Sequence, residues 1–87
     1  MDKYVWHSVR DELPPASSPL LILATERQLR DVGGDIIPGQ AIKNIQFGYF
    51  APDYETSAWR DEMDTPVYEE EDFKITHWMF APNIPED

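Results

Sequence analysis

The side chains of this 87-residue chain that could do chemistry are two histidines, four serines and an excess of carboxylates. His77 lies between Thr76 and Trp78, and an imidazole titrates near neutral pH, which suits acid–base chemistry or ligand contact. The competing interpretation is structural: a half-buried ring whose nitrogen bonds to backbone or to a carboxylate. Nothing in the spacing brings His7 beside His77, and the structural interpretation is favoured.

The sequence contains no recognisable catalytic or metal-binding motif. None of the four serines lies in a nucleophile motif such as G-x-S-x-G. The absence of cysteine excludes thiol catalysis, thiolate metal sites and disulfides. Glu69–Asp72 lacks the spacing of a calcium loop, and Gly33-Gly34 lacks the lysine of a phosphate-binding loop. We therefore predict that the protein is not an enzyme and holds no metal or cofactor.

The formal charge is −10, from 17 acidic and 7 basic side chains, and residues 51–87 carry nearly all of the excess. A negative field repels nucleic acid and anionic membranes and attracts basic surfaces. We expect no direct nucleic-acid or membrane contact, and a partner protein with a basic surface. Seven acids within twelve positions would bind it: Asp61, Glu62, Asp64, Glu69, Glu70, Glu71 and Asp72. Alternatively, these acids form a solvated face that serves solubility only.

The aromatic side chains have two competing interpretations. Each buries about 150–250 Å², and a short chain needs that area, so the three tryptophans, with Tyr49 and Phe50, are expected to build the core. The alternative is an aromatic pocket that stacks a flat ligand. Its candidate residues are Trp6, Trp59, His77 and Trp78. Its candidate charge partners are Arg27, Arg30 and Arg60.

The elements that must position these side chains are short strands. Leu20–Ala24, Ile45–Phe50 and Phe73–Phe80 are predicted as the main strands, with shorter extended segments at Tyr4–Val9 and Ser57–Arg60. Period-two alternation in the last main strand puts Phe73, Ile75, His77 and Met79 on one face and Lys74, Thr76, Trp78 and Phe80 on the other. The predicted fold is α+β or mainly β, a small three- to four-stranded antiparallel sheet with proline-rich, loop-rich connections.

The chain is expected to be one domain over residues 1–87. Turn signals at Gly33-Gly34-Asp35 and Pro38-Gly39 make residues 26–44 a hairpin arm or long excursion, a candidate mobile segment, rather than a helix. The longest apolar run, Leu20–Ala24, is far shorter than the roughly 20 residues of a membrane span or the about 7–15 of a signal peptide.

Two terminal patterns carry a family resemblance. They are Trp6-x-Ser8-Val9-x-Asp11-x-Leu13-Pro14 and Thr76-His77-Trp78-Met79-x-x-Pro82. The other residues that carry the resemblance are Leu20-Leu21-Ile22-Leu23, Gly48-Tyr49-Phe50, Trp59 and Pro85. With these residues the chain resembles the domain-of-unknown-function 551 family, small proteins of bacteriophages and prophages. Residues 26–44 are longer than the short hairpin expected for that family.

The resemblance implies a phage accessory role in the host cytoplasm and supplies no catalytic residue. Together with the charge, it predicts a small acidic phage protein that binds and inhibits a host protein, an anti-defence or nucleic-acid-handling target, through its acidic surface. The alternatives are a protein that sequesters a small ligand in an aromatic pocket, and a structural or assembly module. The partner and the oligomeric state stay open.

Overall fold

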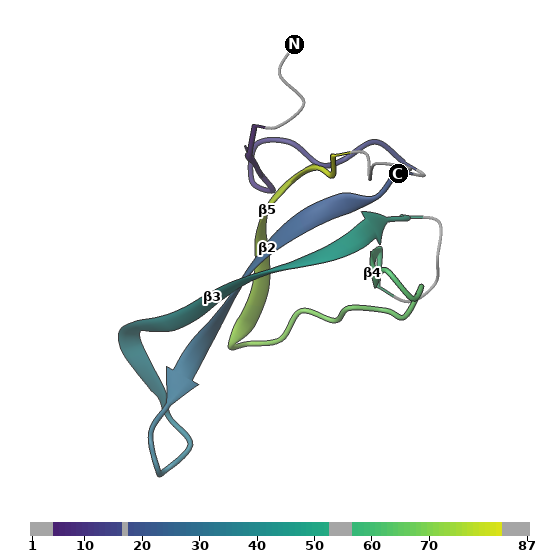
Figure 1. Cartoon of the computed structure of the whole chain (residues 1–87). Coiled ribbons are helices and arrows are strands. Elements are labelled where there is room, and N and C mark those ends of the chain that lie inside the picture. The colour runs from purple at the N-terminus through teal and green to yellow at the C-terminus, as the bar shows by residue number, and fades with distance from the viewer. Residues whose placement is uncertain (1–4, 17, 53–56, 83–87) are drawn as a thin grey trace, which may run out of the picture.

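The computed structural model describes residues 5–16, 18–52 and 57–82, and these form one antiparallel sheet of five strands (Figure 1). The strands are β1 (His7–Ser8), β2 (Leu21–Arg30), β3 (Ile36–Phe50), β4 (Trp59–Asp61) and β5 (Phe73–Phe80). Their order across the sheet is β1-β5-β2-β3-β4. The described residues contain no helix, so the mainly β prediction is confirmed.

The prediction of three or four strands is wrong, because the two short extended segments also pair. His7 lies opposite Trp78, which adds β1 to one edge of the sheet. Trp59 lies opposite Phe50, which adds β4 to the other edge. Tyr4 and Pro85, which belong to the predicted segment Tyr4–Val9 and to the family pattern, lie outside the described residues.

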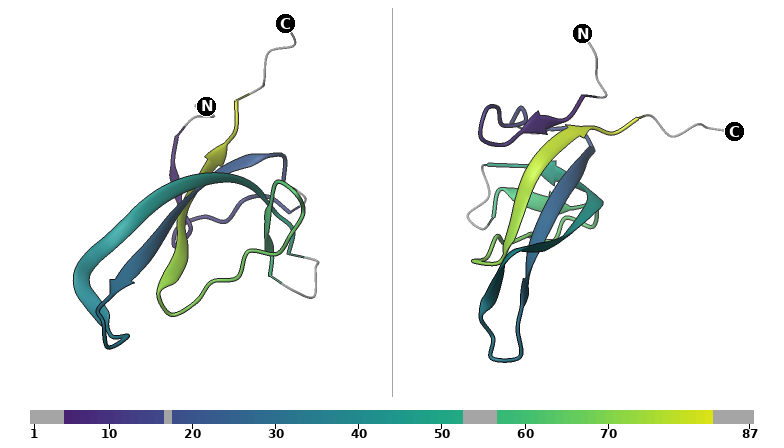
Figure 2. Two further views of the ribbon diagram at one scale, coloured as in Figure 1. Left: turned by 60° about the horizontal axis from the view of Figure 1, so that its bottom comes forward. Right: turned by 90° about the vertical axis from the view of Figure 1, so that its left-hand side faces the viewer.

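Residues 26–44 form a hairpin arm, which is one of the two conformations predicted for them. β2 and β3 pair from Leu21 opposite Gly48 to Gln28 opposite Ala41, and the arm extends beyond the other strands (Figure 2). At its tip the Asp31 carboxylate accepts the backbone N–H groups of Gly33 and Asp35, at 2.9 and 3.0 Å. These hydrogen bonds stabilise the turn. β2 and β3 are both longer than predicted.

The core lies on one face of the sheet, which we call the core face. Its buried side chains are Leu21, Leu23, Phe50, Trp59, Ile75 and Trp78. Alternation along β2 buries Leu21 and Leu23 and turns Ile22 and Ala24 to the opposite face. We call that opposite face the open face, because Ile45 and Phe47 on it are 67 % and 44 % exposed and no described strand or helix covers it.

A β-bulge in β5 changes which side chains share a face. Ala24 lies opposite His77 but Thr25 lies opposite Ile75, so Thr76 is one extra residue in β5. Ile75 and Trp78 consequently both face the core, at 2 % and 1 % exposure. The predicted alternation, which put these two residues on opposite faces, is wrong at this point.

Trp78 is the centre of the core. Its indole Nε1 donates to the Glu12 backbone oxygen at 2.8 Å, and the His7 ring stacks on it with centroids 4.4 Å apart. Trp59 packs against Phe50 with centroids 4.8 Å apart. The core role predicted for these aromatic side chains is confirmed.

Trp6 departs from that prediction, because it is 42 % exposed. It precedes β1 and lies on the open face, opposite in direction to His7, which stacks on the core. Tyr49 is only half-buried, because strand alternation turns it away from the buried Phe50.

The part of the chain that the structure describes holds no helix long and apolar enough to cross a membrane.

Candidate functional site

A groove with a volume of about 640 Å³ crosses the open face. Its lining residues are Trp6, Ala24, Thr25, Glu26, Lys43, Asn44, Ile45, Thr76 and His77. β2, β3 and β5 supply its floor, and the segment before β1 supplies the Trp6 wall. Its size falls within the range of about 300–1,000 Å³ that is usual for small-molecule sites.

The hollow follows from the sizes of three side chains in one row across the sheet. Ala24 of β2 lies opposite Ile45 of β3 on one side and His77 of β5 on the other. A small side chain between two larger ones leaves a depression, which the Trp6 ring borders. Ile45 is 67 % exposed, so its apolar surface lies at the rim of the groove.

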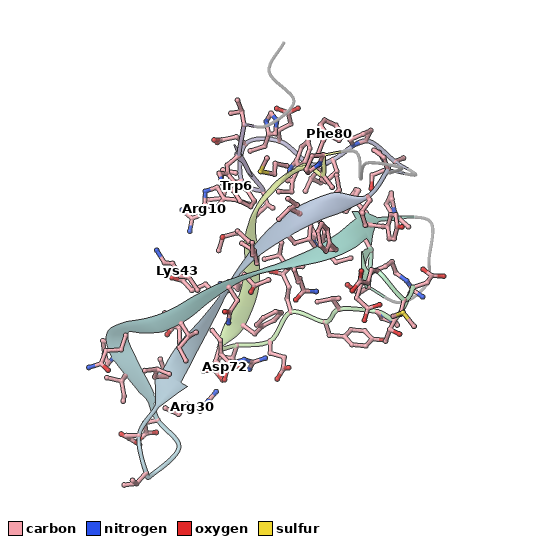
Figure 3. The ribbon with its side chains drawn as sticks, viewed as in Figure 1. Trp6, Arg10, Arg30, Lys43, Asp72 and Phe80 are labelled. Atoms are coloured by element: carbon pink, nitrogen blue, oxygen red, sulfur yellow. The ribbon has the colours of Figure 1, made fainter. Side chains whose placement is uncertain are left out.

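The next row across the open face is charged. Lys43 and Lys74 both lie opposite Glu26, one on each neighbouring strand. Neither lysine forms an ion pair within the described residues, and neither does Arg10. Figure 3 shows the side chains of Arg10 and Lys43 projecting on the same side of the molecule as Trp6. This part of an acidic chain is therefore locally cationic.

The two histidines of the chain are not brought together. His7 stacks on Trp78, and its Nδ1 lies 3.4 Å from a Glu12 carboxylate oxygen. His77 is exposed in the groove, and its Nδ1 lies 2.9 Å from the Thr76 hydroxyl. That hydroxyl is also placed to donate to the Ala24 backbone oxygen at 3.3 Å, and in that arrangement Nδ1 is the donor to the hydroxyl. In that arrangement His77 does not accept the hydroxyl proton of Thr76.

The predicted ligand pocket is brought together only in part. Trp6 and His77 meet in the groove, whereas Trp59 and Trp78 are buried in the core. The proposed charge partners are engaged elsewhere: Arg27 and Arg30 with Asp72, and Arg60 with Asp64. Sequence reasoning missed Lys43 and Ala24, although extending the alternation of Ile45 and Phe47 back by two residues would have placed Lys43 on the same face.

The seven predicted partner-binding acids divide into two groups at the ends of the β4–β5 connection (Figure 1). In the first group, Asp61 accepts the backbone N–H groups of Met63 and Thr65, both at 2.9 Å. Asp64 accepts Nε of Arg60 at 3.1 Å, and Glu62 is exposed. Two of these three carboxylates thus hold the turn after β4.

The second group, Glu69–Asp72, is less solvated than expected for a charge run. Asp72 accepts Nε of Arg30 at 3.2 Å and Nη1 of Arg27 at 3.4 Å, and its side chain is only 14 % exposed. Glu69 accepts the Ile75 backbone N–H at 3.1 Å. The expectation of a fully solvated face is therefore wrong for Asp72, whereas Glu70 and Glu71 are exposed.

Within the described residues, no group of three His, Asp or Glu side chains is placed to hold a metal ion. Comparisons of the chain with protein-family models, with curated proteins and with solved structures found no match. Membership of the domain-of-unknown-function 551 family therefore stays a prediction.

Proposed function

We propose that this chain is a binding protein with no reaction of its own, and that its open face docks onto another protein. The observation that carries the proposal is the exposure of three large apolar side chains on a sheet face without a second layer. Trp6 is 42 %, Ile45 67 % and Phe47 44 % exposed. Clustered exposed apolar side chains mark interaction sites, and tryptophan is enriched among the residues that dominate binding energy.

The charges beside this apolar centre suit a partner that carries carboxylates. Lys43 and Lys74 flank the single Glu26, and Arg10 adds a further cation on the side of Trp6. Complementary charge of this kind steers association and selects partners more than it adds affinity. An acidic, partly apolar surface is therefore the partner that the open face favours, which differs from the basic partner expected from composition.

Site-specific photo-crosslinking separates the two surfaces. A benzoylphenylalanine is introduced in place of Ile45 on the open face, of Glu71 in the acidic group, or of Met63, which is 82 % exposed after β4 and serves as the control. We expect a discrete protein adduct from position 45 only, in the cells that produce the protein. An adduct from position 71 alone would support acidic docking on a basic partner, and equal adducts from all three positions would contradict a specific face.

The phage origin and the inhibition of a host protein, which the family resemblance implies, stay predictions within this proposal. The Glu71 probe tests the acidic surface through which that inhibition was expected. An adduct from Ile45 instead would leave a host protein as a candidate partner but would move its binding surface to the groove.

The groove itself favours a second candidate function, the binding of a planar anion. The Trp6 ring offers a stacking surface, and Lys43 lines the same groove. Adenosine 5′-monophosphate is a suitable probe, with adenosine and inorganic phosphate as controls. Amide shifts confined to the groove for the nucleotide, and lost in Trp6→Ala, would support this function; shifts of equal size for phosphate alone would contradict it.

A further inference from the structure

We propose that two copies of this chain associate through the free edge of β3, by antiparallel pairing of residues Ala41–Phe47 about a two-fold axis. The proposal concerns the edge of the sheet, and it is independent of what docks on the open face. It commits to a second copy of this chain as the occupant of that edge.

The outer edge of β3 is unpaired over most of its length. β4 pairs with β3 only at Gly48, Tyr49 and Phe50. Within the described residues, no strand pairs with that side of the rest of β3, and every residue from Pro38 to Ile45 is exposed. A long, exposed edge with apolar side chains is a template for pairing with another chain.

Hydrogen bonds at the end of β3 show which backbone groups point outward. The Phe50 N–H donates to the Ser18 hydroxyl at 2.8 Å, and its carbonyl accepts the Ser18 N–H at 3.3 Å, on the side of β2. The next residue points the other way, because the Ala51 N–H donates to the Ala58 carbonyl at 2.7 Å. Strand alternation therefore turns the N–H and C=O groups of Lys43, Ile45 and Phe47 toward the free edge.

The usable edge has two natural ends. Arg30 lies opposite Ile36 but Gln28 lies opposite Ala41, so β3 holds extra residues around Pro38 and Gly39. A proline and a bulge of this kind stop strand pairing below Ala41. At the other end, pairing with β4 begins at Gly48. Seven residues remain between these limits.

The charge distribution favours a second copy as the occupant. Lys43 is the only charged residue of β3, in a chain of net charge −10. Pairing at this edge therefore places one cation and no carboxylate of each copy at the seam. Centring the pairing on Asn44 puts Lys43 opposite Ile45 and Ala41 opposite Phe47 of the other copy, so no like charges face each other. About eight backbone hydrogen bonds then form between the copies.

The symmetry has a geometric consequence. Antiparallel pairing of identical edges places the two-fold axis perpendicular to the sheet, so both open faces lie on the same side of one ten-stranded sheet. Lys43 and Ile45 line the groove of each copy. The dimer would therefore present two neighbouring grooves in a single surface.

Sedimentation equilibrium of the full chain tests the proposal at concentrations up to about 1 mM, where small interfaces associate. We expect a monomer–dimer equilibrium whose dissociation constant falls as salt rises from 0.15 to 0.5 M, because salt screens the repulsion between two acidic copies. Ile45→Pro removes an outward N–H without touching the pairing with β2, and it should weaken dimerisation at least tenfold. The control is Val32→Pro, at the first central position of the hairpin turn, where proline is well tolerated.

Hydrogen exchange of the parent chain keeps the proposal testable even where Ile45→Pro fails to fold. The amides of Lys43, Ile45 and Phe47 should exchange more slowly as protein concentration rises, whereas the inward amide of Gln46 should not change. A monomer at all concentrations and salts would overturn the proposal. So would a dimer that survives Ile45→Pro in a folded protein, or concentration-dependent protection elsewhere.

Discussion

Gly48→Ala tests whether close packing between β3 and its neighbours holds the short strand β4 in place. Gly48 is buried on the core face, opposite Leu21 on one side and Asp61 on the other. A Cβ atom built there lies against the Arg60 backbone oxygen and only 2.7 Å from Cδ1 of Leu23. The leucine can rotate, but the carbonyl oxygen belongs to β4, so β4 must move away from β3.

Two opposing effects set the size of the change. Forcing a methyl group into a packed core costs about 1–3 kcal/mol. Replacing glycine with alanine also restricts the unfolded chain, which returns about 0.4–1 kcal/mol of stability. The overpacking is larger because a backbone oxygen cannot rotate out of the way. We expect the free energy of unfolding to fall by about 1–2 kcal/mol and the midpoint of thermal unfolding by about 4–16 °C.

Urea unfolding, followed by the fluorescence of the buried Trp59 and Trp78, measures this change. Gly33→Ala at the hairpin tip is the matched control, because its nearest neighbour is a side-chain oxygen of Asp31 at 3.3 Å and not a backbone atom of another strand. The control should stay within about 0.5 kcal/mol of the parent. A Gly48→Ala variant as stable as the control would show that β4 does not depend on this close approach.

Three further predictions concern side chains that the structure assigns to the core or to turns. Trp78→Phe should lower the free energy of unfolding by about 1–3 kcal/mol in urea titrations. The reason is that the hydrogen bond to the Glu12 carbonyl and part of a buried ring are lost. An unchanged midpoint of urea unfolding would contradict this. Glu69→Lys should lower the free energy of unfolding by about 1–2 kcal/mol, because the Glu69 carboxylate accepts the Ile75 backbone N–H. The control Glu70→Lys should stay within about 0.5 kcal/mol of the parent. Equal effects of the two variants would contradict a capping role for Glu69. Asp72→Asn should lower the free energy of unfolding by under about 1 kcal/mol for each of its two ion pairs. The difference from the parent, measured by thermal unfolding, should be smaller in 1 M salt. A difference independent of salt would exclude an ionic origin.

The centres of the main strands could be predicted from sequence because their patterns are local. Leu20–Ala24 and Phe73–Phe80 are apolar or alternating; all of the second segment lies in β5, and the first lies in β2 from Leu21 on. The first half of β3 was missed as a strand, because Pro38 and Gly39 indicate a turn when they are considered alone. They are accommodated only because β2 continues alongside and the extra residues bulge out of register.

The candidate site was harder to predict, because its residues depend on which face of the sheet each side chain takes. Trp6 and Trp78 are the same residue type, yet one is exposed and the other is buried. The bulge at Thr76 shifts the alternation of β5 by one residue, and nothing in the local sequence marks it. Ala24 creates the groove by being small beside Ile45, which is visible only once the strand register is known.

The attachment of β1 has a consequence for the order in which the protein folds and opens. Within the described residues, two residue pairs join β1 to β5, and they connect positions about 70 residues apart. The β2–β3 arm closes through a short local turn. The arm should therefore form early in folding, and the pairing of β1 with β5 should form last and open first. Trp6 directly precedes β1, so opening of β1 moves one wall of the groove and also removes the His7 ring from Trp78 in the core. Access of a ligand to the groove then depends on the local opening and closing of β1.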